Sequence, residues 1–158
     1  MAEFDNRTHT TDNNKTRDIL QNLIETCRDG QNGFRESAEH IKTPEIREFF
    51  NQQSLQRAKF ASELEAEARL LGDSDVSTTG TTLAAMHRAW IDLKSALGGG
   101  DEAIIGAAET GEDSAKKAYE EAMKESLPSN VREVVQRQAD QVIESHDRVR
   151  DFRDRKAA

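Results

Sequence analysis

The chain has 158 residues, of which 35% are hydrophobic, 33% are charged and 5% are aromatic. This length suits one domain, and the balance is typical of a long-helix bundle, which needs only a narrow apolar stripe on each helix. The net charge of −8 argues against nucleic-acid binding, and no apolar run approaches the roughly 20 residues that cross a membrane, so we expect neither partner.

The first segment, residues 1–14, is polar and rich in Thr, Asn and Asp. We expect it to be a disordered tail that precedes a single helical domain over residues 15–158. It contains no apolar stretch of the kind found in signal peptides, which favours a cytoplasmic location.

The first hairpin is predicted from two long helical patterns, over residues 16–42 and 44–71, joined at a proline. Thr43 is expected to be the N-cap of the second helix, with Pro44 at its first position and Gly72 as its stop. Apolar or small residues recur every three or four positions along the first helix. They are Ile19, Leu20, Leu23, Cys27, Gly30, Phe34, Ser37 and Ile41.

A connector then leads to the second hairpin. Residues 73–80 read as a loop, and a shorter helix is expected over residues 82–97, with Leu83, Met86, Trp90 and Leu97 on one face. Three glycines, Gly98 to Gly100, end it. Sixteen helical residues span about 24 Å, so this connector can carry the chain along most of a bundle.

The second hairpin is predicted from helices over residues 101–127 and after Pro128. The first has an alanine-rich stripe, and the second has a valine-rich stripe with Asn130 and Glu133 spaced as a capping box. The sequence therefore predicts an all-α bundle of two antiparallel hairpins, joined by a crossover that contains a shorter fifth helix. This is the layout of a ferritin-like four-helix bundle, in which the third helix starts at the same end as the second.

Ferritin-like di-metal bundles use a Glu on two helices and a Glu-x-x-His motif on the other two. The chain has no Glu-x-x-His motif, because Asn6, Ser37, Ala84 and Ile143 stand three residues before its four histidines. Helical phase also places several glutamates away from the apolar stripes, where they would be surface charges. These are Glu25, Glu36, Glu39 and Glu109, while Glu67 falls on a stripe near the end of the bundle. We therefore assign no catalytic, cofactor or metal residues, and iron or another divalent metal stays as the alternative.

Counting from the proline hinges places a set of polar residues and glycines at one height inside the bundle. The glycines are Gly30, Gly33 and Gly111. The polar residues are Gln53, Gln56, Glu112 and His146, which we call the polar niche. Glu112 and His146 are positioned to pair. Two interpretations are open, since glycines and buried glutamines serve close helix packing as well as ligand binding.

Two further residues are expected to be structural. Cys27 lies on the apolar face of its helix, where a buried thiol is expected. Trp90, the only tryptophan, should anchor the connecting helix across the bundle. His87 and Arg88 beside it would either line an entrance to the niche or form hydrogen bonds at the surface.

Five short motifs together resemble a known family. They are Asp29-Gly30-Gln31-Asn32-Gly33-Phe34, Glu63-Leu64, His87-Arg88-Ala89-Trp90, Glu109-Thr110-Gly111-Glu112-Asp113 and His146-Asp147. The chain resembles small bacterial ferritin-like four-helix-bundle proteins classed as a domain of unknown function, over roughly residues 15–155. The resemblance implies a ferritin-like fold and a bacterial, cytosolic, stress-linked setting, without an assigned reaction or ligand set.

Two functions follow from these observations. The first is a non-enzymatic scaffold or interaction module that binds a protein partner or a second copy of the chain. The alternative is a binder of a metal or a small ligand, with iron oxidation as its most demanding form, that uses the polar niche.

Overall fold

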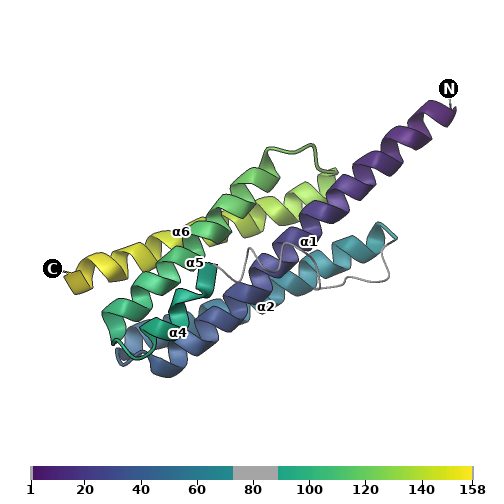
Figure 1. The fold of residues 1–158 in the computed structure, drawn as a ribbon. Helices are drawn as coiled ribbons and strands as arrows, with labels where there is room; N and C mark the ends of the chain where they lie inside the picture. Colours follow the sequence, from purple (N-terminus) through teal and green to yellow (C-terminus); the bar gives the residue numbers. More distant parts are fainter. Residues whose placement is uncertain (1, 73–88, 158) are drawn as a thin grey trace.

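The computed structural model describes residues 2–72 and 89–157, with side chains from residue 13 to residue 72 and from 89 to 156. Four long helices form two hairpins (Figure 1), and a short helix stands before the second one. Their bounds are α1 Ala2–His40, α2 Pro44–Leu70, α4 Asp92–Ala96, α5 Asp101–Met123 and α6 Ser129–Ala157. The predicted all-α bundle of two hairpins is confirmed. Within the described residues, no helix has the length and apolar character needed to cross a membrane.

The four long helices pack in a ring, with α1 against α2 and α5, and α6 against α5 and α2. The backbone N–H groups of Lys42 and Thr43 donate to the carboxylate of Asp101, over 2.7 and 2.9 Å. These bonds tie the turn of the first hairpin to the first residue of α5. The third long helix therefore starts at the same end of the bundle as α2, as the connector length predicted.

Two helix ends differ by several residues from their predicted bounds, apart from the short helix before the second hairpin, of which only the part from residue 89 is described. α1 begins at Ala2, whereas a polar tail was expected before a helix start near Thr16, and Figure 1 shows its first turns projecting beyond the bundle. No proline or glycine occurs before Gly30 to stop the helix. α5 ends at Met123, short of the predicted Leu127, and the chain turns at residues 124 and 125 before it reaches Pro128.

The proposed capping box of α6 is wrong, while the stops at the two glycine positions are confirmed. α6 already begins at Ser129, so Asn130 lies inside the helix and its Nδ2 donates to Glu67 Oε2 over 2.9 Å. Gly72 and Gly100 adopt positive φ angles of 91° and 89°, which glycine reaches without a steric penalty. Thr43 does occupy the N-cap position of α2, but its hydroxyl bonds to Asp101 and does not cap the helix.

The core consists of two apolar clusters. One contains Leu20, Leu23, Phe60, Leu64, Tyr119, Val135 and Val142, and the other contains Phe34, Phe50, Ile104, Ala108, Val149 and Phe152. Between the two clusters, the four long helices contribute residues that include Gly30, Arg57, Glu112 and Ser145. A polar layer therefore divides the core at the height where the sequence placed the polar niche.

Replacing Asp101 with Asn is expected to lower the free energy of unfolding by about 1–3 kcal/mol at pH 7, because three charge-assisted hydrogen bonds to the hinge are weakened. Burial raises the pKa of Asp101, but the hydrogen bonds from Lys42 and Thr43 outweigh it and lower that pKa. Since the folded-state pKa is lowered, the stabilisation is present above about pH 4 and is lost as the pH falls further.

Urea denaturation of the wild-type and Asp101→Asn proteins at pH 7 and at pH 3 measures both effects. The exposed neighbour Glu102 provides the control, since Glu102→Gln should change stability by less than about 0.5 kcal/mol. A difference between wild type and Asp101→Asn that is as large at pH 3 as at pH 7 would contradict the assignment.

Candidate functional site

The polar layer is built around a buried ion pair between α2 and α5. Arg57 Nη1 lies 2.7 Å from Glu112 Oε1, and Arg57 Nη2 donates to Glu112 Oε2 over 3.0 Å. The two side chains are 1% and 0% exposed. Ser145 of α6 accepts a hydrogen bond from Arg57 Nη2 over 2.8 Å and donates one to Glu112 Oε2. One charge pair and one hydroxyl thus connect three helices.

The electrostatics of this pair favour the charged form of Arg57. Burial lowers the pKa of Arg57, but the charge of Glu112 and its hydrogen bond raise it further than burial lowers it. A lone ion in a protein interior costs several kcal/mol, whereas a well-bonded pair is tolerated. The charges of Arg57 and Glu112 therefore cancel inside the bundle, and neither can be removed alone without leaving the other buried and unpaired.

α1 contributes space to the layer. A Cβ atom on Gly30 would lie 3.2 Å from Arg57 Nη1, so the glycine lets the guanidinium pass close to the α1 backbone. On Gly33 and Gly111, a Cβ atom would come within 2.3 and 2.2 Å of the Trp90 ring. The two glycines face the indole from opposite helices, and Trp90 also meets Phe34 edge-on at 5.3 Å. Trp90 thus packs between α1 and α5, as the anchoring prediction required.

The structure brings some members of the predicted polar niche together and separates others. Glu112 lies at its centre, and Gln53, which is 8% exposed, lies four residues before Arg57 on α2. Gln56 is half-buried, and its Nε2 donates to Gln141 Oε1 over 2.9 Å. These two glutamines therefore belong to the side of the layer where α2 meets α6.

The predicted pairing of Glu112 with His146 is wrong. His146 Nε2 lies 2.6 Å from Asp113 Oδ1 and its Nδ1 lies 3.1 Å from Asp147 Oδ1, so its partners are carboxylates at the rim of the bundle. Adjacent residues on a helix are separated by about 100°. Ser145 points at Glu112. The next residue, His146, therefore points about 100° away from that direction, toward Asp113.

Arg57 is the functional residue that sequence reasoning missed. It shares a face of α2 with buried Phe50, Gln53, Phe60 and Leu64, at helical spacing. An arginine in phase with an apolar stripe indicates a buried cation that needs a carboxylate partner. The position of Arg57 on the stripe is a signal present in the sequence, and it is separate from the carboxylate and imidazole pattern of a metal site.

Glu25 was also misplaced. It was expected at the surface, but it is fully buried, and Gln21 Nε2 donates to its Oε1 over 3.3 Å. Residues 23–27 are all buried, so this part of α1 has no solvent-exposed face. Glu39 is exposed as predicted, and Glu36 is partly exposed. Glu109 is partly buried and pairs with Arg153.

A second buried polar chain lies next to the layer. Cys27 Sγ is 3.1 Å from the Tyr119 hydroxyl, which donates to Gln138 Oε1 over 2.7 Å. Burial raises the pKa of Cys27 to about 11, although the hydrogen bond with Tyr119 opposes this. Since the thiolate is the reactive form, the Cys27 thiol is structural at neutral pH, which confirms the sequence interpretation.

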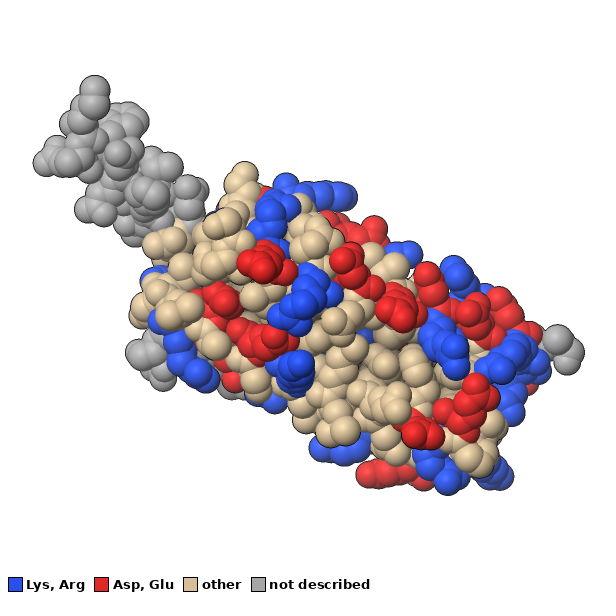
Figure 2. All heavy atoms as spheres, turned by 180° about the vertical axis from the view of Figure 1, so that it is seen from behind, with Lys and Arg blue, Asp and Glu red and all other residues tan. Residues whose placement is uncertain are grey.

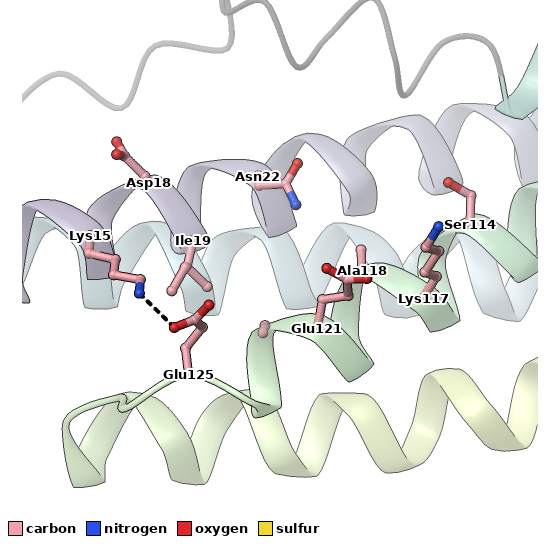
Figure 3. Close-up of a pocket in the computed structure, with 10 residues that line it drawn as sticks. Lys15, Asp18, Ile19, Asn22, Ser114, Lys117, Ala118, Glu121 and Glu125 are labelled. Atoms are coloured by element: carbon pink, nitrogen blue, oxygen red, sulfur yellow. Dashed lines mark ion pairs between the residues drawn. The ribbon is translucent and has the colours of Figure 1, made fainter.

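The surface has an open pocket of about 520 Å³ between α1 and α5 (Figure 3). Lys15 and Glu125 form an ion pair of 2.8 Å at one end of it, and Lys117 and Glu121 also line it. None of its polar side chains is buried, so nothing holds a reacting group there in a fixed, water-excluded position. The pocket is therefore a weak candidate for catalysis.

Metal binding has little support in the described part of the chain. There, no group of three or more His, Cys, Asp or Glu side chains is arranged to hold a metal ion.

Two predictions fall outside the described residues. They are the helix face with Leu83 and Met86 and the proposed entrance at His87 and Arg88.

Comparison with known proteins supports part of the resemblance found in the motifs, namely a domain of unknown function, over a shorter range. A family model described as "Domain of unknown function (DUF2383)" matches residues 15–125. The match covers α2, α4, α5 and most of α1, and it stops before α6, which supplies Ser145 and His146. No curated protein matches the chain. Since the family model spans more than half of the sequence, the chain belongs to the DUF2383 family, a domain whose function is unknown.

Proposed function

We propose that this protein is a non-enzymatic helical scaffold of ferritin-like descent, acting as a stress-related interaction module in the bacterial cytoplasm. Its partner is another protein or a second copy of the chain. The observation that carries this proposal is the ion pair of Arg57 with Glu112. The ferritin-like relation is supported by the order of the helices, with two antiparallel hairpins and one long crossover.

Inward carboxylates of ferritin-like metal proteins are neutralised by the ions that they bind. In this chain the positive charge comes from Arg57, and both oxygens of Glu112 lie within reach of its guanidinium. Ser145 bonds to the same carboxylate, so Oε2 accepts two hydrogen bonds from within the protein. A permanent internal cation gives a stable bundle that needs no metal to balance its buried charge.

The surface favours a protein partner over nucleic acid. On the face seen in Figure 2, acidic and basic side chains are interspersed, and Lys and Arg do not gather into one continuous patch. The chain as a whole carries a charge of −8, which repels phosphate backbones. Leu55 and Leu70 of α2 are 73% and 75% exposed and provide separate apolar contacts for a protein surface.

Metal analysis of protein purified without chelators, combined with an iron(II) oxidation assay, tests the proposal. We expect metal well below one ion per chain and no oxidation above the buffer rate. Stoichiometric metal that is lost in a Glu112→Gln variant would overturn the scaffold proposal in favour of the metal-binding alternative. Sedimentation velocity over a wide concentration range then separates the two partners, since only self-association depends on the concentration of this chain.

A further inference from the structure

The groove between α2 and α6 has the chemistry of a small-molecule site. Its volume is about 630 Å³, within the range typical of ligand pockets. Gln53, Gln56 and Ser145 line it on the inner side, and Phe49 supplies an apolar wall. The groove lies beside the polar layer but does not include Arg57 or Glu112 among its lining residues.

Two hydrogen-bond acceptors in this groove lack donors. Gln53 is 8% exposed, and its Oε1 is shielded from solvent without a hydrogen-bond partner among the described residues. The Oε1 atom of Gln56 is also shielded from solvent and has no hydrogen-bond partner among the described residues, although its Nε2 donates a hydrogen bond to Gln141. A buried acceptor without a donor is unfavourable by about 1–3 kcal/mol, and such atoms are rare in native proteins. Because both oxygens are shielded from the groove, rotation of either amide would be needed to present its oxygen there, where a group that donates hydrogen bonds would satisfy it.

The charged side chains at the rim of the groove indicate the sign of the charge on a group that would bind there. Glu144, Asp147 and Asp151 line the groove from α6. Glu144 and Asp151 form no ion pair with any described residue, whereas Asp147 is engaged by His146 and by Arg150. Arg148, the basic residue of the groove, is turned toward Glu45 at 3.4 Å and toward the ring of Phe152. The groove consequently favours a cation.

The spacing of the carboxylates specifies the shape. Glu144 and Asp151 are seven residues apart on α6, which separates them by about 10 Å along the helix axis. A compact metal ion could contact only one of them, and no described cluster of three ligands is present. An extended cation with several ammonium groups could contact both carboxylates, donate to Gln53 and Gln56, and lay its methylene chain on Phe49.

We propose that the α2–α6 groove binds an aliphatic polyamine, with Gln53 as the residue that recognises an ammonium group. This site goes beyond the scaffold function and does not depend on it, because the Arg57–Glu112 pair is not part of the groove. Whether the protein self-associates or lacks metal has no bearing on the outcome.

Isothermal titration of the full chain with spermidine tests the site. Two control titrations accompany it: Mg²⁺ tests for an effect of charge alone, and the uncharged 1,8-octanediol tests for an effect of apolar contact alone. We expect saturable binding of one spermidine per chain and no comparable binding of either control. Gln53→Leu keeps the net charge and should weaken binding about tenfold, the effect of one hydrogen bond to a charged group. The exposed neighbour Gln52 lies outside the groove, so Gln52→Leu should bind as wild type does.

A Gln53→Glu variant guards against a purely structural effect of the leucine. It places a carboxylate beside the same ammonium group and should tighten binding several-fold. Absence of saturable spermidine binding overturns the proposal, as does equal binding by Gln53→Leu and Gln52→Leu. Displacement of spermidine by equimolar Mg²⁺ would also overturn it, since that result indicates a diffuse attraction of cations to the acidic rim.

Discussion

Replacing Arg57 with Met is expected to lower the free energy of unfolding by about 3–5 kcal/mol. The methionine fills much of the volume of the arginine stem but carries no charge. Glu112, which is 0% exposed, would then be a buried carboxylate without a cation, and Ser145 would lose one of its two partners. Urea denaturation at pH 7, followed by circular dichroism at 222 nm, measures the loss.

The surface pair of Arg137 with Glu63 provides the matched control. It also connects α2 with α6, but its side chains are 44% and 27% exposed, so Arg137→Met should cost less than about 1 kcal/mol. The double variant Arg57→Met/Glu112→Leu removes both buried charges and should regain most of the stability lost in Arg57→Met. If the double variant is less stable than Arg57→Met, the loss does not come from an uncompensated charge.

Gly111→Ala is expected to displace Trp90 from its position between α1 and α5. The new Cβ atom would lie 2.2 Å from the ring, far below any van der Waals distance. Alanine is favoured over glycine inside a helix by about 1 kcal/mol, but the overlap with a ring that is packed against Phe34 should cost more. We expect a net loss of about 1–3 kcal/mol. Because Trp90 is the only tryptophan, its fluorescence emission should shift to the red as the ring becomes exposed.

Gly106 is the control on the same helix, because a Cβ atom there would meet nothing within 4 Å. Gly106→Ala should stabilise the protein by up to about 1 kcal/mol and leave the emission unchanged. In a Trp90→Ala background, Gly111→Ala should behave in the same way as Gly106→Ala. A Gly111→Ala variant that is equally destabilised with and without Trp90 would show that the indole is not what requires the glycine.

Arg57 and Trp90 are two side chains that join different helices of the bundle. Arg57 holds α2 to α5 and α6 through charge, and Trp90 fills the space that two glycines leave between α1 and α5. Arg57 lies between the two apolar clusters, and Trp90 is partly buried and packs against the cluster that contains Phe34. The middle of the bundle is therefore specified by polar bonds and shape complementarity, while the two ends are held by ordinary apolar packing.

The order of the four long helices and the height of the polar layer could be predicted from the sequence alone. Proline hinges and glycine stops are local signals, since they act through the backbone angles of one or two residues. The connector length then placed the start of α5 beside Thr43, and counting from that end put Gly33, Gly111 and Glu112 at one level. All of these inferences need only the fixed rise and period of a helix.

Only the tertiary structure decided which side chains meet within that layer. The direction of a side chain around a helix can be predicted from helical periodicity only to within about one residue. The sequence pattern therefore could not show that Ser145 faces Glu112 and that His146 does not. Nor could it show that Arg57 reaches across the bundle or that Glu25 is covered, because both depend on side-chain length and on the distances between helices. The partner of a buried charge is the oppositely charged group that lies close to it in three dimensions. Helical periodicity in the sequence does not give the distances between side chains on different helices.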